Sequence, residues 1–302
     1  RRQRQMCIRD SATPATVAAA ERVIREMGLN PVLGKNILNV HGYMAGTDNE
    51  RMSDFQEMLD DNSIKGLFCI TSGFGAMHLL PLLDYHKFSR NPKVIVGCGE
   101  NSVLLNAIYE RSGLVTFHGP NLDEIDCRET FERVKNSLTS SGTWEPLSSN
   151  TGSDTDVFRS TFYCPVPGDA EGHLIGGNLT ALVSLLGTPY EPKFSGSILL
   201  LDDVHEQTGI LDRWFTTLYL AGHLQTCKAV ALGMFEECGP STNGNMMSVM
   251  DMFSDRLKYL GTPSCFGLPV GQTKVSNVVP FGIKARLFAA AGRLEFCEPA
   301  LS

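Results

Sequence analysis

The chain has 302 residues, of which 42% are hydrophobic and 20% are charged, and its formal net charge at pH 7 is −7. This length accommodates one large domain or two ordinary domains with a sizeable buried core, and we expect two. An acidic balance without pattern argues against nucleic acid or an anionic membrane surface as a partner. No apolar run approaches the length of a membrane span.

The cysteines indicate a reducing compartment. There are nine, scattered singly and without a C-x-x-C pair. This pattern predicts neither a zinc site nor a disulfide framework. We therefore expect a cytoplasmic protein, and the sequence indicates no cofactor.

The opening segment "RRQRQMCIRDS" is unlike the rest of the chain. Met6 to Ser11 is the translation of a transposase end used in sequencing-library preparation, so we interpret residues 1–11 as an adapter artefact and exclude them from fold reasoning. Its arginines then say nothing about nucleic acid. We expect a first strand ahead of "SATPATVAAAERVIREMG" to be missing, together with any signal peptide.

From residue 13 to residue 120 helices and strands alternate. The patterns predict helices over 13–28, 48–61 (capped by Asp48), 76–85 and 101–113. They predict strands over 30–34, 64–70, 93–97 and 114–120, of which 64–70 reads as wholly buried. This order predicts an α/β fold whose mostly parallel sheet is covered on both faces.

The composition changes near Asn121, where a polar stretch rich in Ser, Thr, Asn and Gly begins. A second α/β half follows, and the alternation in "IKARLFA" before "AAGR" predicts antiparallel strands at the end. We therefore predict an N-terminal domain over 12–125, a connection over 126–168 and a C-terminal domain over 169–302.

Several blocks, taken in order, resemble the LD-carboxypeptidase family, the serine peptidases that include muramoyltetrapeptide carboxypeptidases and microcin-immunity peptidases. The blocks are "HGYMAGTDNERMSDFQEMLDD", "GFGAMHLLPLLDY", "GLVTFHGP", "GGNLTALVSLLGTPYEP", "ILDRWFTTLYLAG" and "EPALS". The resemblance implies an N-terminal parallel-sheet domain like that of class I glutamine amidotransferases and a C-terminal swivelling α/β domain. It also implies an active site in the cleft between them, and a homodimer.

The same resemblance places the family's catalytic triad on altered residues. Gly99 in "GCGEN" stands where the family has its nucleophilic serine, Asp202 in "LLLDD" where it has glutamate, and Gln272 in "GLPVGQ" where it has histidine. A hydroxyl nucleophile needs a base and a carboxylate that orients the base. Gly99 has no attacking atom and Gln272 exchanges no proton near neutral pH, so we expect no serine-type hydrolysis.

Binding remains open. The family's oxyanion donors correspond to the amides of Glu100 and of the loop Thr71, Ser72 and Gly73, and the helix that follows Glu100 directs its positive end there. We therefore expect a non-catalytic homologue that binds a small peptide-like or carboxylated ligand. Thr71 replaces the family's arginine in this loop, and Glu100 replaces its aspartate.

The alternative is an active enzyme with different machinery. Cys98 is one candidate nucleophile, although we expect it to point toward the sheet. Glu100 or Asp202 acting as general base is another possibility. A metal site is a third, with candidate ligands Glu100, Asp202, Asp203, His205 and Glu206, although a solvated acidic loop explains that cluster equally well. We interpret His78 and His118 as structural or surface residues.

Overall fold

The structure is a computed structural model that describes residues 12–139, 142, 144–149, 162–240 and 247–301, together with the backbone of residues 2–6. The chain divides into two compact units. Unit 1 is Arg1–Thr139 with Lys274–Gly282, and unit 2 is Ser140–Thr273 with Ile283–Ser302. No helix in the described part of the chain is both long and apolar enough to span a bilayer.

Unit 1 contains a six-stranded sheet in the order β12-β5-β4-β3-β1-β2. All neighbours are parallel except β12, which runs antiparallel to β5. The strands are β1 (Arg2–Met6), β2 (Asn30–Leu33), β3 (Ile64–Cys69), β4 (Val94–Gly97), β5 (Thr116–His118) and β12 (Val279–Phe281).

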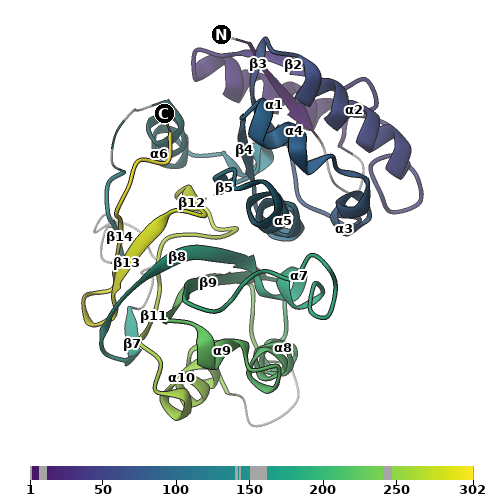
Figure 1. The fold of residues 1–302 in the computed structure, drawn as a ribbon. Helices are drawn as coiled ribbons and strands as arrows, with labels where there is room; N and C mark the ends of the chain where they lie inside the picture. Colours follow the sequence, from purple (N-terminus) through teal and green to yellow (C-terminus); the bar gives the residue numbers. More distant parts are fainter. Residues whose placement is uncertain are drawn as a thin grey trace. The chain divides into compact units, whose positions relative to one another are not determined.

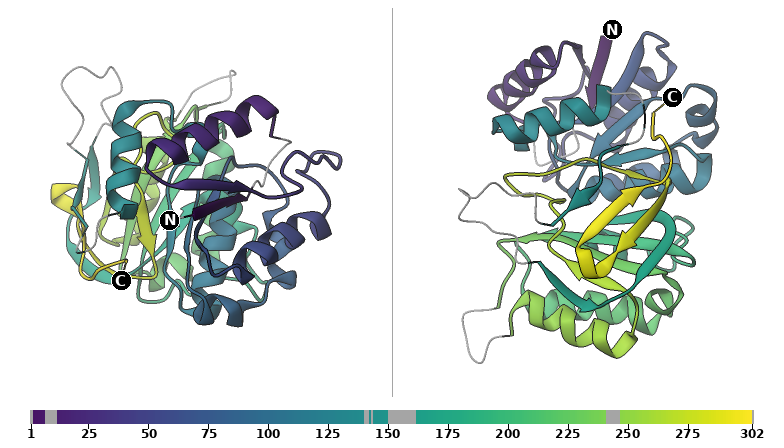
Figure 2. Two further views of the ribbon diagram at one scale, coloured as in Figure 1. Left: turned by 90° about the horizontal axis from the view of Figure 1, so that it is seen from above. Right: turned by 90° about the vertical axis from the view of Figure 1, so that its left-hand side faces the viewer.

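Helices cover both faces of this sheet, as the alternating pattern predicts. On one face α2 contacts β1 and β3, α5 contacts β4 and β5, and α4 packs against both helices (Figure 1). On the other face α1 and α6 lie side by side (Figure 2). The helices are α1 (Pro14–Glu26), α2 (Asp48–Asp60), α3 (Ala76–Leu79), α4 (Tyr85–Arg90), α5 (Ser102–Ser112) and α6 (Arg128–Thr139), with short 3-10 turns η1 (Leu80–Leu82), η2 (Gly99–Asn101) and η3 (Leu122–Glu124).

The core of unit 1 lies between the central strands and α5. Leu67 and Phe68 of β3 and Ile95 and Val96 of β4 are buried, as are nearly all side chains in the first half of α5. The prediction of a wholly buried strand at 64–70 is therefore confirmed, apart from the exposed Lys65. A strand covered on both faces lacks the alternation of a half-exposed strand.

At the place of the strand that we expect to be missing, the structure has residues 2–6. The backbone of Arg2–Met6 forms β1 and pairs in parallel with β2 and β3. Strand pairing uses backbone N–H and C=O groups, which every non-proline residue carries. The pairing therefore does not bear on the adapter interpretation, and residues 7–11 lie outside the described part of the chain.

Unit 2 contains an eight-stranded sheet in the order β6-β14-β13-β8-β9-β10-β11-β7. The central strands β8 to β11 are parallel and the outer pairs antiparallel. Its strands are β6 (Leu147–Ser148), β7 (Tyr163–Val166), β8 (Asp169–Asn178), β9 (Ser197–Val204), β10 (Ala229–Glu236), β11 (Ser264–Phe266), β13 (Lys284–Phe288) and β14 (Arg293–Phe296). Its helices are α7 (Leu179–Val183), α8 (Thr208–Leu220), α9 (His223–Thr226) and α10 (Val249–Leu260), with the 3-10 turn η4 (Ala289–Ala291).

The predicted antiparallel ending is confirmed by β13 and β14, which pair from Ala285 with Phe296 to Phe288 with Arg293 (Figure 2, yellow). The predicted domain limits differ from the units in two places. Helix α6 belongs to unit 1, and residues 274–282 return to unit 1 to add β12. Composition does not reveal such a return, because strand order is set by non-local pairing. Residues 150–161 of the expected connection lie outside the described residues.

Helix α2 is capped one residue earlier than predicted. Thr47, not Asp48, is the N-cap: its hydroxyl accepts a hydrogen bond from the Glu50 amide at 3.3 Å, and the Glu50 carboxylate accepts one from the Thr47 amide at 2.7 Å. This reciprocal pair is a capping box. It leaves the Asp48 side chain available for other contacts.

We expect Thr47→Ala to lower the free energy of unfolding by about 1 kcal/mol, because the Glu50 amide loses its acceptor. Urea unfolding followed by circular dichroism measures this. Ser53→Ala, at an exposed position of the same helix, is the matched control and is expected to cost nothing, since alanine favours helix. Equal stability of both variants would contradict the capping role.

Candidate functional site

The turn between β4 and α5 has glycine at its apex. Gly99 is buried and has a φ of 60°, in the left-handed region. Its carbonyl oxygen accepts a hydrogen bond from the Ser102 hydroxyl at 2.7 Å. Glycine adopts this conformation without steric cost, so the turn is formed without strain and presents no side chain.

Cys98, the residue before the apex, points into a buried polar network. Its thiol donates to the Glu124 carboxylate at 3.0 Å, and its sulfur accepts a hydrogen bond from the Asn121 side-chain amide at 3.2 Å. The side chain is fully buried. A buried thiol bonded to a carboxylate is typical of a structural cysteine rather than a nucleophile.

The expected oxyanion donors are engaged within the chain. The Glu100 amide donates to the Ser72 hydroxyl at 3.1 Å. Thr71 is buried, and its carbonyl oxygen accepts a hydrogen bond from the Asn101 side chain at 3.3 Å. Ser72 and Gly73 are half-buried. In this conformation the Ser72 hydroxyl accepts the hydrogen bond of the Glu100 amide, and the assignment of these amides to ligand binding stays a prediction.

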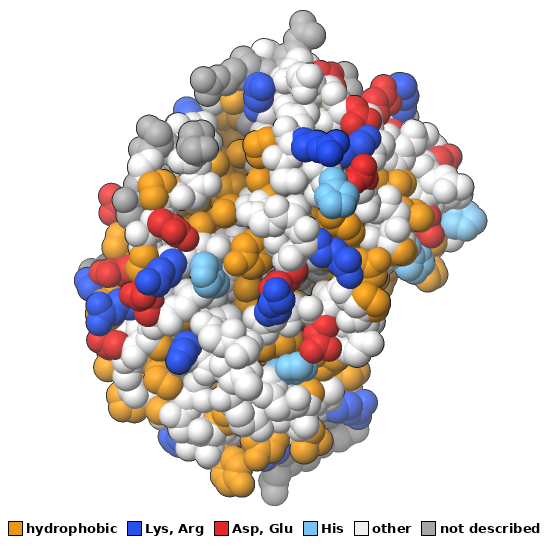
Figure 3. Space-filling model, viewed as in Figure 1, with side chains coloured by type: hydrophobic (Ala, Val, Ile, Leu, Met, Phe, Trp, Pro, Cys, Tyr) orange, Lys and Arg blue, Asp and Glu red, His pale blue; other side chains and the backbone are white. Residues whose placement is uncertain are grey.

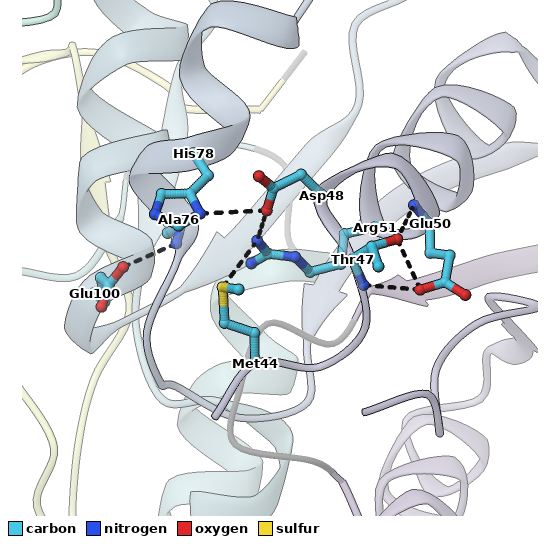
Figure 4. Close-up of polar contacts among 8 residues, drawn as sticks. All are labelled: Met44, Thr47, Asp48, Glu50, Arg51, Ala76, His78 and Glu100. Atoms are coloured by element: carbon cyan, nitrogen blue, oxygen red, sulfur yellow. Dashed lines mark hydrogen bonds and ion pairs between the residues drawn. The ribbon is translucent and has the colours of Figure 1, made fainter. Parts of the chain in front are cut away.

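The Glu100 side chain folds back toward the loop before α3 (Figure 4). Its carboxylate accepts a hydrogen bond from the Ala76 amide at 2.8 Å, and the neighbouring Gly75 amide also favours its charged form. Burial raises the pKa of Glu100 above its ordinary value, while the two amides and the charges of His78 and Arg51 act in the opposite direction. The carboxylate therefore lies where an anion is bound by backbone amides.

A second group of charges borders Glu100. The Arg51 guanidinium of α2 is almost completely buried and contacts Asp48, and one of its nitrogens lies 3.6 Å from the Met44 sulfur (Figure 4). His78 of α3 is about half exposed and lies 3.3 Å from Asp48. Burial acts to raise the pKa of Asp48, but its bonds to Arg51 and His78 hold that pKa below its ordinary value.

Sequence reasoning did not identify Arg51 or Asp48 as site residues. The available signal is their i, i+3 spacing in "GTDNER", which places an aspartate and an arginine on one face of a helix. The structural or surface interpretation of the two histidines agrees with the structure for His118, which is buried and stacks on Phe281 with ring centroids 5.2 Å apart. His78 is a surface residue that belongs to the charged group.

Unit 2 contains the other two residues that the resemblance assigns to the triad, Asp202 and Gln272. Asp202 is buried in β9, and its Cβ lies 2.9 Å from where a Cβ on Gly271 would stand. Gly271 has a φ of 118° and precedes Gln272. Only glycine fits this close approach without strain. The residue before Gln272 therefore packs against Asp202 in unit 2.

The neighbouring acidic residues are committed to other contacts. The Asp203 carboxylate accepts hydrogen bonds from the Asn178 side chain at 2.7 Å and from the Thr180 amide and hydroxyl at 2.9 and 2.8 Å. Burial raises its pKa to about 6. His205 lies 3.0 Å from Glu237. Within the described residues no group of three or more His, Cys, Asp or Glu side chains is arranged to hold a metal ion, so the metal alternative gains no support.

We expect Gly99→Ala to lower the free energy of unfolding by about 1–2 kcal/mol, the cost of an L side chain in the left-handed region. Gly209→Ala is the matched control: a Cβ at Gly209 of α8 meets nothing within 4 Å, and this change is expected to stabilise the helix. Chemical denaturation of both variants measures the difference. A Gly99→Ala protein as stable as the parent would show that the turn relaxes.

Glu100 is expected to make stability depend on pH. Because its folded-state pKa lies above the ordinary value of 4.5, the folded chain holds this proton more tightly than the unfolded chain. The stability that Glu100 contributes is thus fully present below pH 4.5, and it is lost as pH rises through the folded-state pKa. Within the described residues, the charges of His78 on α3 and Arg51 on α2 act on Glu100, and Asp48 contacts both of them.

The measurement compares unfolding of the parent and Glu100→Gln between about pH 4 and pH 7. The parent is expected to lose stability relative to the variant as pH rises, since the variant carries no titratable group at this position. A difference that stays constant, or that grows in favour of the parent, would refute the assignment.

Comparisons with known proteins cover both units. Residues 7–119 match the LD-carboxypeptidase N-terminal domain and residues 171–287 the LD-carboxypeptidase C-terminal domain. The chain is 33% identical to a probable murein peptide carboxypeptidase of Bacillus subtilis, over 92% of this chain and 85% of that protein. It is 30% identical to the murein tetrapeptide carboxypeptidase of Pseudomonas aeruginosa, over 91% of each.

Solved structures show the same fold. The microcin C7 self immunity protein MccF in complex with aspartyl sulfamoyl adenosine has a TM-score of 0.84 and 25% identity, with 99% of this chain and 97% of that one covered. The muramoyltetrapeptide carboxypeptidase from Oxalobacter formigenes has a TM-score of 0.81 and 27% identity, with 98% of each chain covered.

Proposed function

The chain belongs to the LD-carboxypeptidase family, and from this premise we propose that it binds a small peptide-like or carboxylated ligand without cleaving it by the family's serine mechanism. The observation that carries the proposal is Gly99 at the apex of the turn after β4, at a φ of 60°. Such a turn presents the nucleophile in many α/β hydrolytic enzymes. Here it presents backbone only.

The other two triad positions support the same conclusion. Gln272 cannot accept a proton from a hydroxyl and return it to a leaving group near neutral pH. Asp202, at the family's glutamate position, lies beside Gly271 and so beside a glutamine rather than a histidine. The group that would orient a base therefore has no base to orient. Loss at three coupled positions is explained most simply by loss of the reaction.

Support for binding comes from relatives of similar fold. MccF has been solved in complex with aspartyl sulfamoyl adenosine and with glutamyl sulfamoyl guanosine, both small molecules. The present chain keeps a buried Asp202 in unit 2 and amides that hold a carboxylate in unit 1. These features favour a small polar ligand. The homodimer that the family resemblance implies is part of the proposal.

The surface and the cysteines are consistent with the remaining parts of the proposal. On the face shown in Figure 3, basic and acidic side chains are interspersed, which favours a small ligand over nucleic acid as partner.

The eight cysteines within the described residues remain thiols. A chain with this many free thiols suits a reducing compartment, and we propose a cytoplasmic location for that reason.

The test is release of D-alanine from a muramoyl tetrapeptide by the parent and by the triple revertant Gly99→Ser, Asp202→Glu, Gln272→His. We expect no turnover by the parent, because it lacks an attacking atom at the turn. Turnover by the revertant alone would show that the scaffold still accepts the family's substrate.

Turnover by the parent would overturn the proposal. Three treatments then identify the machinery: Cys98→Ala removes the alternative nucleophile, Glu100→Gln removes a candidate general base, and a chelator removes a metal. Thermal unfolding with and without the tetrapeptide measures binding in the same samples. A parent that neither turns over nor is stabilised by the peptide would also contradict the proposal.

A further inference from the structure

We propose that unit 1 contains a carboxylate-binding site, formed by the amides of Gly75 and Ala76 and the guanidinium of Arg51. In the structure the Glu100 carboxylate occupies the amide part of this site from within the chain, while Arg51 pairs with Asp48. We infer that the carboxylate of a ligand binds there by replacing Glu100. The inference rests on the proposed function in one respect, namely that the ligand is carboxylated. It adds where that group binds and what competes with it.

The resident group defines the chemistry of the site. The Glu100 carboxylate accepts a hydrogen bond from the Ala76 amide at 2.8 Å, and the neighbouring Gly75 amide also favours its charged form. A backbone amide that donates to a carboxylate makes a charge-assisted contact. The chain's own carboxylate therefore marks a position that suits a carboxylate. Glu100 is only half-buried, so part of its side chain is exposed.

Arg51 supplies an independent observation. Its side chain is 1% exposed, and within the described part of the chain its Nε and Nη1 atoms have no hydrogen-bond partner. Buried donors of a cation without acceptors carry a substantial energetic cost. A Cβ on Gly75 would stand 2.9 Å from Nη1, so the guanidinium lies directly against the backbone that holds the carboxylate. Unused donors of a buried cation thus face the segment that binds an anion.

The surrounding charges limit how strongly Glu100 is held. Asp48 forms an ion pair with one nitrogen of Arg51, and His78 on α3 contacts the same aspartate. Burial also works against the charged form of Glu100. A side chain that occupies a site reduces the apparent affinity of an external ligand by the fraction of time that it is bound there. Removing the Glu100 side chain, and with it the group that fills the position, is therefore expected to strengthen carboxylate binding.

The experiment uses acetate as the probe and acetamide as its neutral counterpart, with binding followed by the shift in thermal unfolding. We expect the acetate concentration that gives half the maximal shift to be at least about tenfold lower for Glu100→Ala than for the parent. Acetamide is expected to show no such gain, because it lacks the negative charge. Glu100→Gln is expected to behave like the parent, since its side chain still fills the position.

Glu26→Ala is the matched control, because it also replaces a glutamate with alanine but at an exposed position on α1. It is expected to leave the response to acetate unchanged. Equal acetate affinity of the parent and Glu100→Ala overturns the inference, as does an equal gain for acetamide or for Glu26→Ala. None of these variants alters Arg51, so its buried guanidinium is present in every sample.

These outcomes are separate from those that test the proposed function. Release of D-alanine by the parent would end the proposed function without changing the response of Glu100→Ala to acetate. Absence of an acetate gain in Glu100→Ala would end the present inference while leaving a catalytically inactive, ligand-binding protein intact.

Discussion

The turn at Gly99 is the constraint from which the local structure follows. Strand β4 runs through the middle of a parallel sheet, and α5 begins a few residues later and packs against β4 and β5. The chain reverses within Cys98–Asn101, and the left-handed conformation of Gly99 makes that reversal possible. The residue before it turns inward to Asn121 and Glu124, and the residue after it turns outward to the loop before α3. The chemistry of the turn is therefore decided by the apex residue, and glycine supplies none.

Electrostatics connects this turn to α2 and α3. Glu100, Arg51, Asp48 and His78 form a group in which opposite charges adjoin, and part of it is buried. Interactions between charges are stronger where water is excluded, and unsatisfied groups cost more there. The Glu100 carboxylate consequently accepts the hydrogen bond of the Ala76 amide and lies in the favourable field of the Arg51 charge.

Sequence patterns predicted the elements well where the signal is local. The helices at 13–28 and 101–113, the buried strand at 64–70 and the closing hairpin follow from periodicity and glycine positions. The cap of α2 was misplaced by one residue, because Thr47 and Asp48 are both good capping residues and only the geometry of Glu50 distinguishes them. The domain limits differed because β12 returns to the first sheet after unit 2 has begun.

By itself the sequence determined the family and the two-part α/β organisation, since each depends on residue types in a fixed order. The assignment of Gly99, Asp202 and Gln272 to the triad positions stays a prediction. Only the tertiary structure decided what the surviving groups do. It showed that the Ser72 hydroxyl accepts a hydrogen bond from the Glu100 amide and that the Glu100 carboxylate accepts one from the Ala76 amide. It also showed that Arg51 lies buried beside Gly75. These contacts join residues separated by more than twenty positions in the chain. Hydrogen bonds and buried charges depend on distance and direction, which residue order does not specify.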